Sequence, residues 1–157
     1  MRLARGCFVL LGFIPSVWAQ VKESTCSITE CGAGTQVVTH ATKSEPFYSC
    51  STRELAEYTN TVLGLLVMQK MLGAGMPNIS DKTGDPEYEG ESKLLIDTLR
   101  KKAGVSTFDE ALAKCKIGLN RVKGMVLNNP KDSVVMWVGS TVNKQTFWMP
   151  KSAADRK

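Results

Sequence analysis

Three cysteines and one histidine near the start of the chain could bind a metal ion or form disulfides: Cys26, Cys31, His40 and Cys50. Three thiolates and an imidazole form a common tetrahedral set for zinc. Structural zinc sites, however, usually begin with a short cysteine pair, and the Cys26–Cys31 interval lies at the upper limit of that spacing. We therefore expect disulfides here, with no bound metal or cofactor, and zinc as the alternative.

A secretory signal at the start of the chain supports the disulfide interpretation. Residues 1–19 combine a basic beginning, an apolar run over residues 6–14, and Val17 and Ala19 at the positions that signal peptidase reads. The apolar run is shorter than the roughly 20 residues that a membrane-spanning helix needs. We expect cleavage before Gln20, a single mature domain over residues 20–157, and a periplasmic or secreted location.

Four cysteines remain after this cleavage, because Cys7 lies within the signal. An even number in an exported chain favours disulfides, since the compartment is oxidising. Four cysteines permit three pairings, and the sequence does not select one of them. We expect one disulfide among Cys26, Cys31 and Cys50, and a second that connects this region to Cys115.

The charge of the mature chain argues against nucleic acid as a partner. Cleavage removes two of the 20 basic residues and none of the 15 acidic ones, which leaves a net charge of +3. A nucleic-acid-binding domain normally carries a much denser basic surface. Contact with a membrane surface remains open, but the processed chain is not expected to span the bilayer.

No familiar catalytic arrangement is evident. His40 is the only histidine, and the chain has no G-x-S-x-G motif. The carboxylates of residues 78–90 lie in a polar stretch that reads as a solvated acidic loop. A small hydrolase with a lysine or carboxylate base is one alternative function. A copper carrier is another, since Met68, Met71 and Met76 supply soft thioether ligands.

The pattern of elements predicts an α+β fold. A cysteine-rich β-hairpin would pair residues 35–42 with 46–49, and a capping box at Ser51 and Glu54 would begin a helix over 52–72. A second helix would cover 91–103, with Leu94, Leu95 and Leu99 inward, and a third would begin at Thr107 and continue to about residue 123. The domain thus divides into five regions: a cysteine-rich hairpin (20–50), an apolar helix (51–77), an acidic loop (78–90), a helix pair (91–123) and a β-hairpin (133–149).

The C-terminal hairpin has two candidate turns, Gly139-Ser140 and Val142-Asn143, and they give different registers. The second choice places Trp137 opposite Trp148 as a cross-strand pair. The polar tail from Pro150 onward is expected to fray.

The second half of the first helix is apolar on all sides, which is typical of a core helix or of a helix that binds something outside the chain. We expect a non-enzymatic interaction module with a protein partner in the cell envelope, acting as an accessory or assembly factor of a bacterial envelope complex. The candidate partner-binding residues are Leu65, Leu66, Met68, Trp137 and Trp148. The residues do not resemble a known family.

Overall fold

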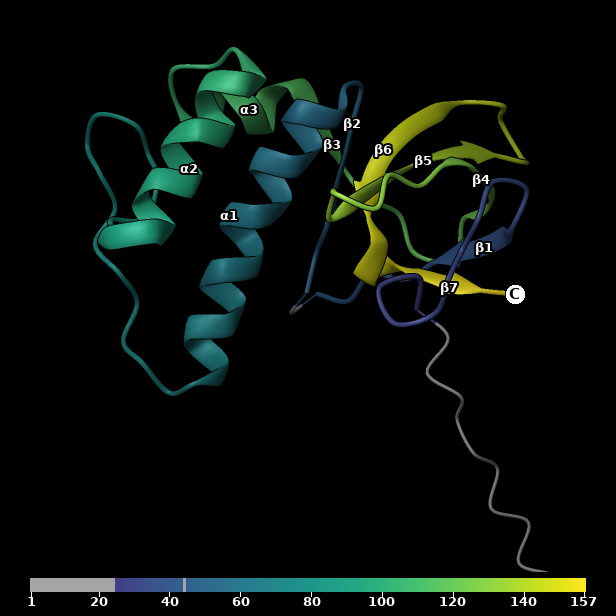
Figure 1. Cartoon of the computed structure of the whole chain (residues 1–157), viewed down its shortest axis with the longest axis horizontal. Helices are drawn as coiled ribbons and strands as arrows, with labels where there is room; N and C mark the ends of the chain where they lie inside the picture. Colours follow the sequence, from purple (N-terminus) through teal and green to yellow (C-terminus); the bar gives the residue numbers. More distant parts are fainter. Residues whose placement is uncertain (1–24, 44) are drawn as a thin grey trace, which may run out of the picture.

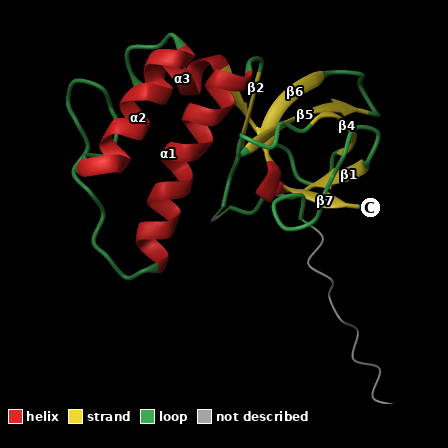
Figure 2. Ribbon diagram, viewed as in Figure 1, coloured by secondary structure: helices red, strands yellow, loops and turns green. Residues whose placement is uncertain are grey.

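The structure is a computed structural model that describes residues 25–43 and 45–157. The predicted signal peptide and its cleavage site lie outside these residues. Figures 1 and 2 show a group of helices on one side of the molecule and a curved sheet on the other. The helices are α1 (Arg53–Met71), α2 (Gly90–Ala103) and α3 (Phe108–Lys114), with a 3₁₀ turn η1 (Lys151–Ala153). The strands are β1 (Gln36–Thr39), β2 (Tyr48–Cys50), β3 (Cys115–Ile117), β4 (Lys123–Asn128), β5 (Val135–Ser140), β6 (Thr146–Pro150) and β7 (Ala154–Arg156).

The strands form one seven-stranded antiparallel sheet in the order β3-β2-β6-β5-β4-β1-β7. Together with the three helices of the described chain, this sheet confirms the predicted α+β class. Three neighbouring pairs are consecutive strands in the sequence, β2–β3, β4–β5 and β5–β6, and all three helices lie between β2 and β3. Most of the sheet is therefore assembled from distant segments.

The cysteine-rich region contains both predicted strands, but they do not form a hairpin with each other. β1 pairs with β4 and β7, whereas β2 pairs with β3 and β6. The distant pairings prevail because each strand gains two neighbours instead of one. Val37, at the centre of β1, is almost completely buried as a result. Cys50 faces Cys115 directly across the β2–β3 pair.

The first helix has the predicted extent, although its cap differs. Thr52, and not Ser51, is the N-cap, and its hydroxyl accepts a hydrogen bond from the Leu55 amide at 3.3 Å. At the start of α3, Thr107 caps the helix as predicted by accepting from the Glu110 amide at 3.1 Å. The Glu110 carboxylate reaches back to the amide of Ser106. Local capping signals thus located helix starts to within a residue.

The third helix is much shorter than predicted. It ends at Lys114, and the chain enters β3 at Cys115, where the disulfide to Cys50 and the sheet pairing hold it extended. Leu119, expected on the inner face of this helix, is 70% exposed. The helical pattern concealed β3, and the following strand β4 lies, apart from Lys123, over residues to which no element was assigned.

In α2, the inward face is rotated from the predicted one. Leu94 and Leu95 are exposed, whereas Ile96 and Leu99 are buried against α1 and α3 residues of the helical core. The three-residue spacing of Ile96 and Leu99 places both on one helical face. Because neighbouring residues of a helix point in different directions, the adjacent leucines cannot all face inward.

The C-terminal hairpin forms with the register in which Trp137 lies opposite Trp148. The tail beyond it does not fray, in contrast to the prediction. Residues 151–153 form a 3₁₀ turn, and β7 pairs with β1, so Ala154 is completely buried. Small side chains at 153 and 154 allow this close packing despite the polar character of the tail.

Two clusters of buried side chains stabilise the domain. The first lies between the helices and the adjoining strands, and includes Tyr58, Val62 and Phe108. The second lies within the curved sheet and includes Val126, Val138 and the disulfide between Cys26 and Cys31. α1 packs along the first cluster with its N-terminal half, where its buried residues are Leu55, Ala56, Tyr58, Thr59 and Val62.

Candidate functional site

The C-terminal half of α1 and the segment after it expose large apolar side chains. We call these side chains the methionine surface. Its members are Met68 (53% exposed), Met71 (79%), Leu72 (75%), Met76 (67%) and Ile79 (51%). Figure 1 shows this end of α1 extending away from the sheet. The surface begins where the buried positions of α1, the last of which is Val62, come to an end.

The segment that bears this surface carries little charge, since Lys70 is the one charged residue over residues 68–79. No charged residue occurs between positions 71 and 80, although charged residues make up 22% of the chain. Single exposed apolar residues are ordinary, but contiguous apolar surface is rare on a soluble domain outside binding sites. The three methionines are flexible, polarisable side chains that adapt to varied apolar partners. The surface therefore presents flexible apolar side chains to its surroundings.

Hydrogen bonds hold the methionine surface in place. The Gln69 side chain donates to the carbonyl oxygen of Gly75 at 2.7 Å and accepts from the Tyr88 hydroxyl at 2.9 Å. Gln69 therefore connects α1 both to the turn that follows it and to the start of α2. These bonds fix the backbone that carries the exposed methionines.

A buried ionic cluster anchors the same loop at a second point. Asp85 is only 4% exposed and accepts hydrogen bonds from the Tyr58 hydroxyl and the Arg100 guanidinium. Arg100 also donates to Asp97 at 2.6 Å. Burial, and then the bond to Asp85, raises the pKa of Tyr58 well above its ordinary value of 10.0. The stretch predicted as a solvated acidic loop is thus clamped to two helices through its central carboxylate.

The buried ionic cluster borders a cavity of about 600 Å³ whose polar residues include Lys82, Lys93 and Asp97. Both oxygens of Asp85 already accept hydrogen bonds, one from Tyr58 and the other from Arg100. Lys93 is paired with Asp97 at 2.9 Å. A general base needs an oxygen or nitrogen that can reach a substrate proton. The arrangement of this cluster is therefore structural, and it gives the hydrolase alternative no support.

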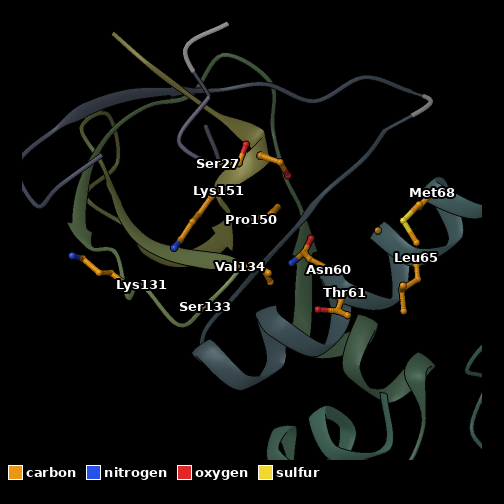
Figure 3. A pocket seen from close by; sticks show the side chains of 12 residues that line it. Ser27, Asn60, Thr61, Leu65, Met68, Lys131, Ser133, Val134, Pro150 and Lys151 are labelled. Carbon is orange, nitrogen blue, oxygen red and sulfur yellow. The ribbon is translucent and has the colours of Figure 1, made fainter. Parts of the chain in front are cut away.

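A groove of about 570 Å³ lies between α1 and the end of the sheet (Figure 3). Four separate parts of the chain line it. They are Ser27 near the N-terminal disulfide; Asn60, Thr61, Gly64, Leu65 and Met68 from α1; Lys131, Ser133 and Val134 from the β4–β5 connection; and Pro150, Lys151 and Ser152 around the end of β6. Gly64 leaves the groove open, since a Cβ atom built there would have no other atom within 4 Å.

The two lysines lie together at one end of the groove, and Leu65 and Met68 lie at the other (Figure 3). The Lys151 ammonium donates to the Pro130 carbonyl at 2.7 Å, and burial lowers its pKa from the ordinary value. Within the described part of the chain, neither lysine has a carboxylate within 4 Å. The groove therefore has a cationic end and an apolar end.

The structure separates the predicted partner-binding residues into two places. Leu65 and Met68 line the groove, and Leu66 packs partly buried against the helical core. Trp137 and Trp148 stack on each other on the sheet, with ring centroids 6.3 Å apart and an angle of 14° between their planes. Neither tryptophan is among the residues that line the groove.

All four cysteines that we expected to remain after processing form disulfides, Cys26 with Cys31 and Cys50 with Cys115. The pairing agrees with the expected division into one local and one distant bridge. It also removes the thiolates that the zinc alternative required. Within residues 25–43 and 45–157, no three His, Cys, Asp or Glu side chains gather as a metal site. His40 instead lies 3.3 Å from a carboxylate oxygen of Asp155.

The groove was not evident in the sequence, because its walls come from residues far apart along the chain. Lys131 and Lys151 carry no local motif, and Gly64 appeared only as part of an apolar helix. The Asp85–Arg100 pair was also missed, since a charged pair 15 residues apart has no spacing signature. The apolar second half of α1 was the one signal that pointed to this region.

No protein-family model matches this chain, and neither a curated protein nor a solved structure matches it significantly. Among the described residues, no helix has both the length and the apolar character needed to cross a bilayer. The two disulfides are consistent with an oxidising compartment outside the cytoplasm.

Proposed function

We propose that this protein is an exported, non-enzymatic interaction module that serves as an accessory or assembly factor of a bacterial cell-envelope complex. The observation that carries the proposal is the methionine surface, because five large apolar side chains are at least half exposed over residues 68–79, where Lys70 is the one charged residue. Covering such a surface with a protein partner releases water from apolar area and is favourable. The partner would be an envelope protein with a complementary apolar face.

The two anchors of the loop support this proposal. Gln69 and Asp85 hold the segment that bears the surface, so less conformational freedom is lost when a partner binds. Exposed apolar residues on a frayed segment would bind with a larger entropic cost. The export signal in the sequence and the two disulfides support an interaction in an oxidising compartment.

Site-specific crosslinking tests the proposal. A photoreactive amino acid is placed at Met71, and in a matched control at Val142, because the two side chains are both 79% exposed on different elements. Irradiation of the producing cells should give one discrete adduct from position 71 and none from position 142. Adducts of equal yield from both positions, or none from position 71, would contradict the proposal.

Purified components then measure the energy of the contact. Met71→Asp should weaken binding to the crosslinked partner at least tenfold, because it introduces a charge at the centre of the apolar contact. Val142→Asp should leave the affinity unchanged. Since both positions are exposed, neither substitution should change the stability of the free protein by more than about 0.5 kcal/mol.

Processing is tested separately by the intact mass of the exported protein. The mature chain should begin at Gln20 and take up no thiol label unless it is first reduced. A mass that includes residues 1–19 would refute cleavage. Labelling without reduction would contradict the disulfide pairing.

A further inference from the structure

The groove between α1 and the sheet is polarised along its length. Its cationic end carries Lys131 and Lys151, and its apolar end carries Leu65 and Met68, with Val134 and Pro150 between them (Figure 3). Its volume of about 570 Å³ falls within the range of roughly 300–1,000 Å³ that small-molecule sites occupy. A ligand that matches this groove has an anionic group at one end and an apolar body.

We propose that this groove binds a single-chain anionic amphiphile, an acyl chain that ends in a carboxylate. The carboxylate would lie between the ammonium groups of Lys131 and Lys151, and the chain would extend along α1 toward Met68. Lys151 is already held toward this end by its bond to the Pro130 carbonyl. Neither lysine has a carboxylate within 4 Å in the described chain, and Asp132 acts on Lys151 only from a longer distance, so the ligand would supply a direct ion pair.

The walls of the groove favour an acyl chain over a peptide segment. An extended peptide requires hydrogen-bonding partners along its backbone. One wall is formed by the middle part of α1, where the backbone groups form hydrogen bonds within the helix. On the other wall Pro150 has no N–H, and the Lys151 amide already donates to the Val134 carbonyl. The Asn60 side chain is occupied as well, by the Tyr48 backbone.

Gly64 lines the groove and makes close approach of a chain feasible. It faces open space, so the helix surface is recessed at this point. Asn60, Gly64, Pro150 and Ser152 also line a smaller adjoining hollow of about 190 Å³. A chain lying across Gly64 can therefore contact apolar surface on both sides of it.

Calorimetric titration with dodecanoate, kept below its critical micelle concentration, tests the proposal directly. We expect saturable binding of one molecule per chain, with affinity rising about two- to fourfold per methylene from octanoate to dodecanoate. Dodecanol, which lacks the charge, should bind about three- to tenfold more weakly. No saturable binding of dodecanoate, or equal affinity for the acid and the alcohol, would overturn the proposal.

Variants assign the binding to the groove. Lys131→Gln combined with Lys151→Gln should reduce dodecanoate affinity to that of dodecanol, whereas Lys102→Gln on α2 should leave it unchanged. Gly64→Leu should weaken both ligands by filling the groove, and Gly64→Ala serves as its control for helix propensity. Equal loss of affinity in the double variant and in Lys102→Gln would show nonspecific charge attraction and would refute the site.

A spectroscopic readout separates binding in the groove from binding elsewhere. With ¹³C-methyl-labelled methionine, dodecanoate should shift the Met68 signal and leave that of Met125, on β4, in place. Binding to anionic phospholipid vesicles without any shift by monomeric dodecanoate would replace this proposal with a membrane-surface interaction. Failure of the crosslinking at Met71 would not affect this result, because Met71 does not line the groove.

Discussion

Replacing Asp85 with a neutral residue is expected to weaken the contacts that hold the loop of the methionine surface against the helices. Asp85→Asn keeps the shape of the side chain but leaves the Arg100 guanidinium without its most buried anion. Removing one partner of a buried ion pair typically costs about 3–5 kcal/mol. We expect a loss near the lower limit, about 3 kcal/mol, because Arg100 retains Asp97 and its side chain is 18% exposed. That loss is a large part of the free energy of unfolding of an ordinary domain, about 5–15 kcal/mol.

Urea denaturation with the disulfides intact measures this loss. Asp81→Asn is the matched control, since Asp81 lies in the same loop but is exposed, and its effect should stay within about 0.5 kcal/mol. Tyr58→Phe alone should cost about 1.5–3 kcal/mol, since the hydroxyl bonds to a charged group. The double variant should lose less than the sum of the two single losses, because both share Asp85. If Asp85→Asn and Asp81→Asn were equally stable, the reasoning would be refuted.

Three further outcomes follow from the packing. Replacing Cys50 and Cys115 by alanine should destabilise the protein by about 4 kcal/mol in urea, against about 2 kcal/mol for the N-terminal disulfide, because the sequence separations are 65 and 5. The free energy of unfolding should fall as the pH rises above about 10, since the unfolded chain then loses the Tyr58 proton that the folded protein retains. Tyr58→Phe should make this fall in the free energy of unfolding with pH less steep. Gly118→Ala should cost about 1–3 kcal/mol, because a Cβ atom there overlaps the Phe47 ring.

A specific result would contradict each of these three predictions. Equal losses for the two disulfides would show that the loop-closure argument does not apply. An unchanged alkaline slope in Tyr58→Phe would assign the pH dependence to other groups. Gly75→Ala, at an exposed glycine with open space around it, is the control for Gly118→Ala, and equal stability of the two would disprove the proposed overlap.

The parts of the fold that were predicted correctly are those with local signals. Capping signals located the starts of α1 and α3 to within a residue, apolar residues at helical spacing indicated α2, and alternation gave β5 and β6 with Trp137 opposite Trp148. The two strands of the cysteine-rich region were recognised as strands but assigned to each other. Their true partners β3, β4, β6 and β7 lie far along the chain, and no local pattern encodes such distant pairings.

The predicted end of α3 was wrong for a related reason. The apolar spacing continues past Lys114, so periodicity alone predicts a longer helix. Cys115 instead joins the sheet, where it is fixed by Cys50, and tertiary structure overrides the local preference. The groove shows the same limit, since Gly64, Val134 and Pro150 come together only through the fold.

The pairing of β7 with β1 connects the fold to the direction in which the chain is made. Residues 154–156 are synthesised long after residues 37–39, which they flank in the sheet. Until β7 has been made, β1 has a free edge and Ala154 cannot fill its place in the sheet core. This part of the sheet can therefore close only after synthesis has passed β7, however early β1 itself has emerged.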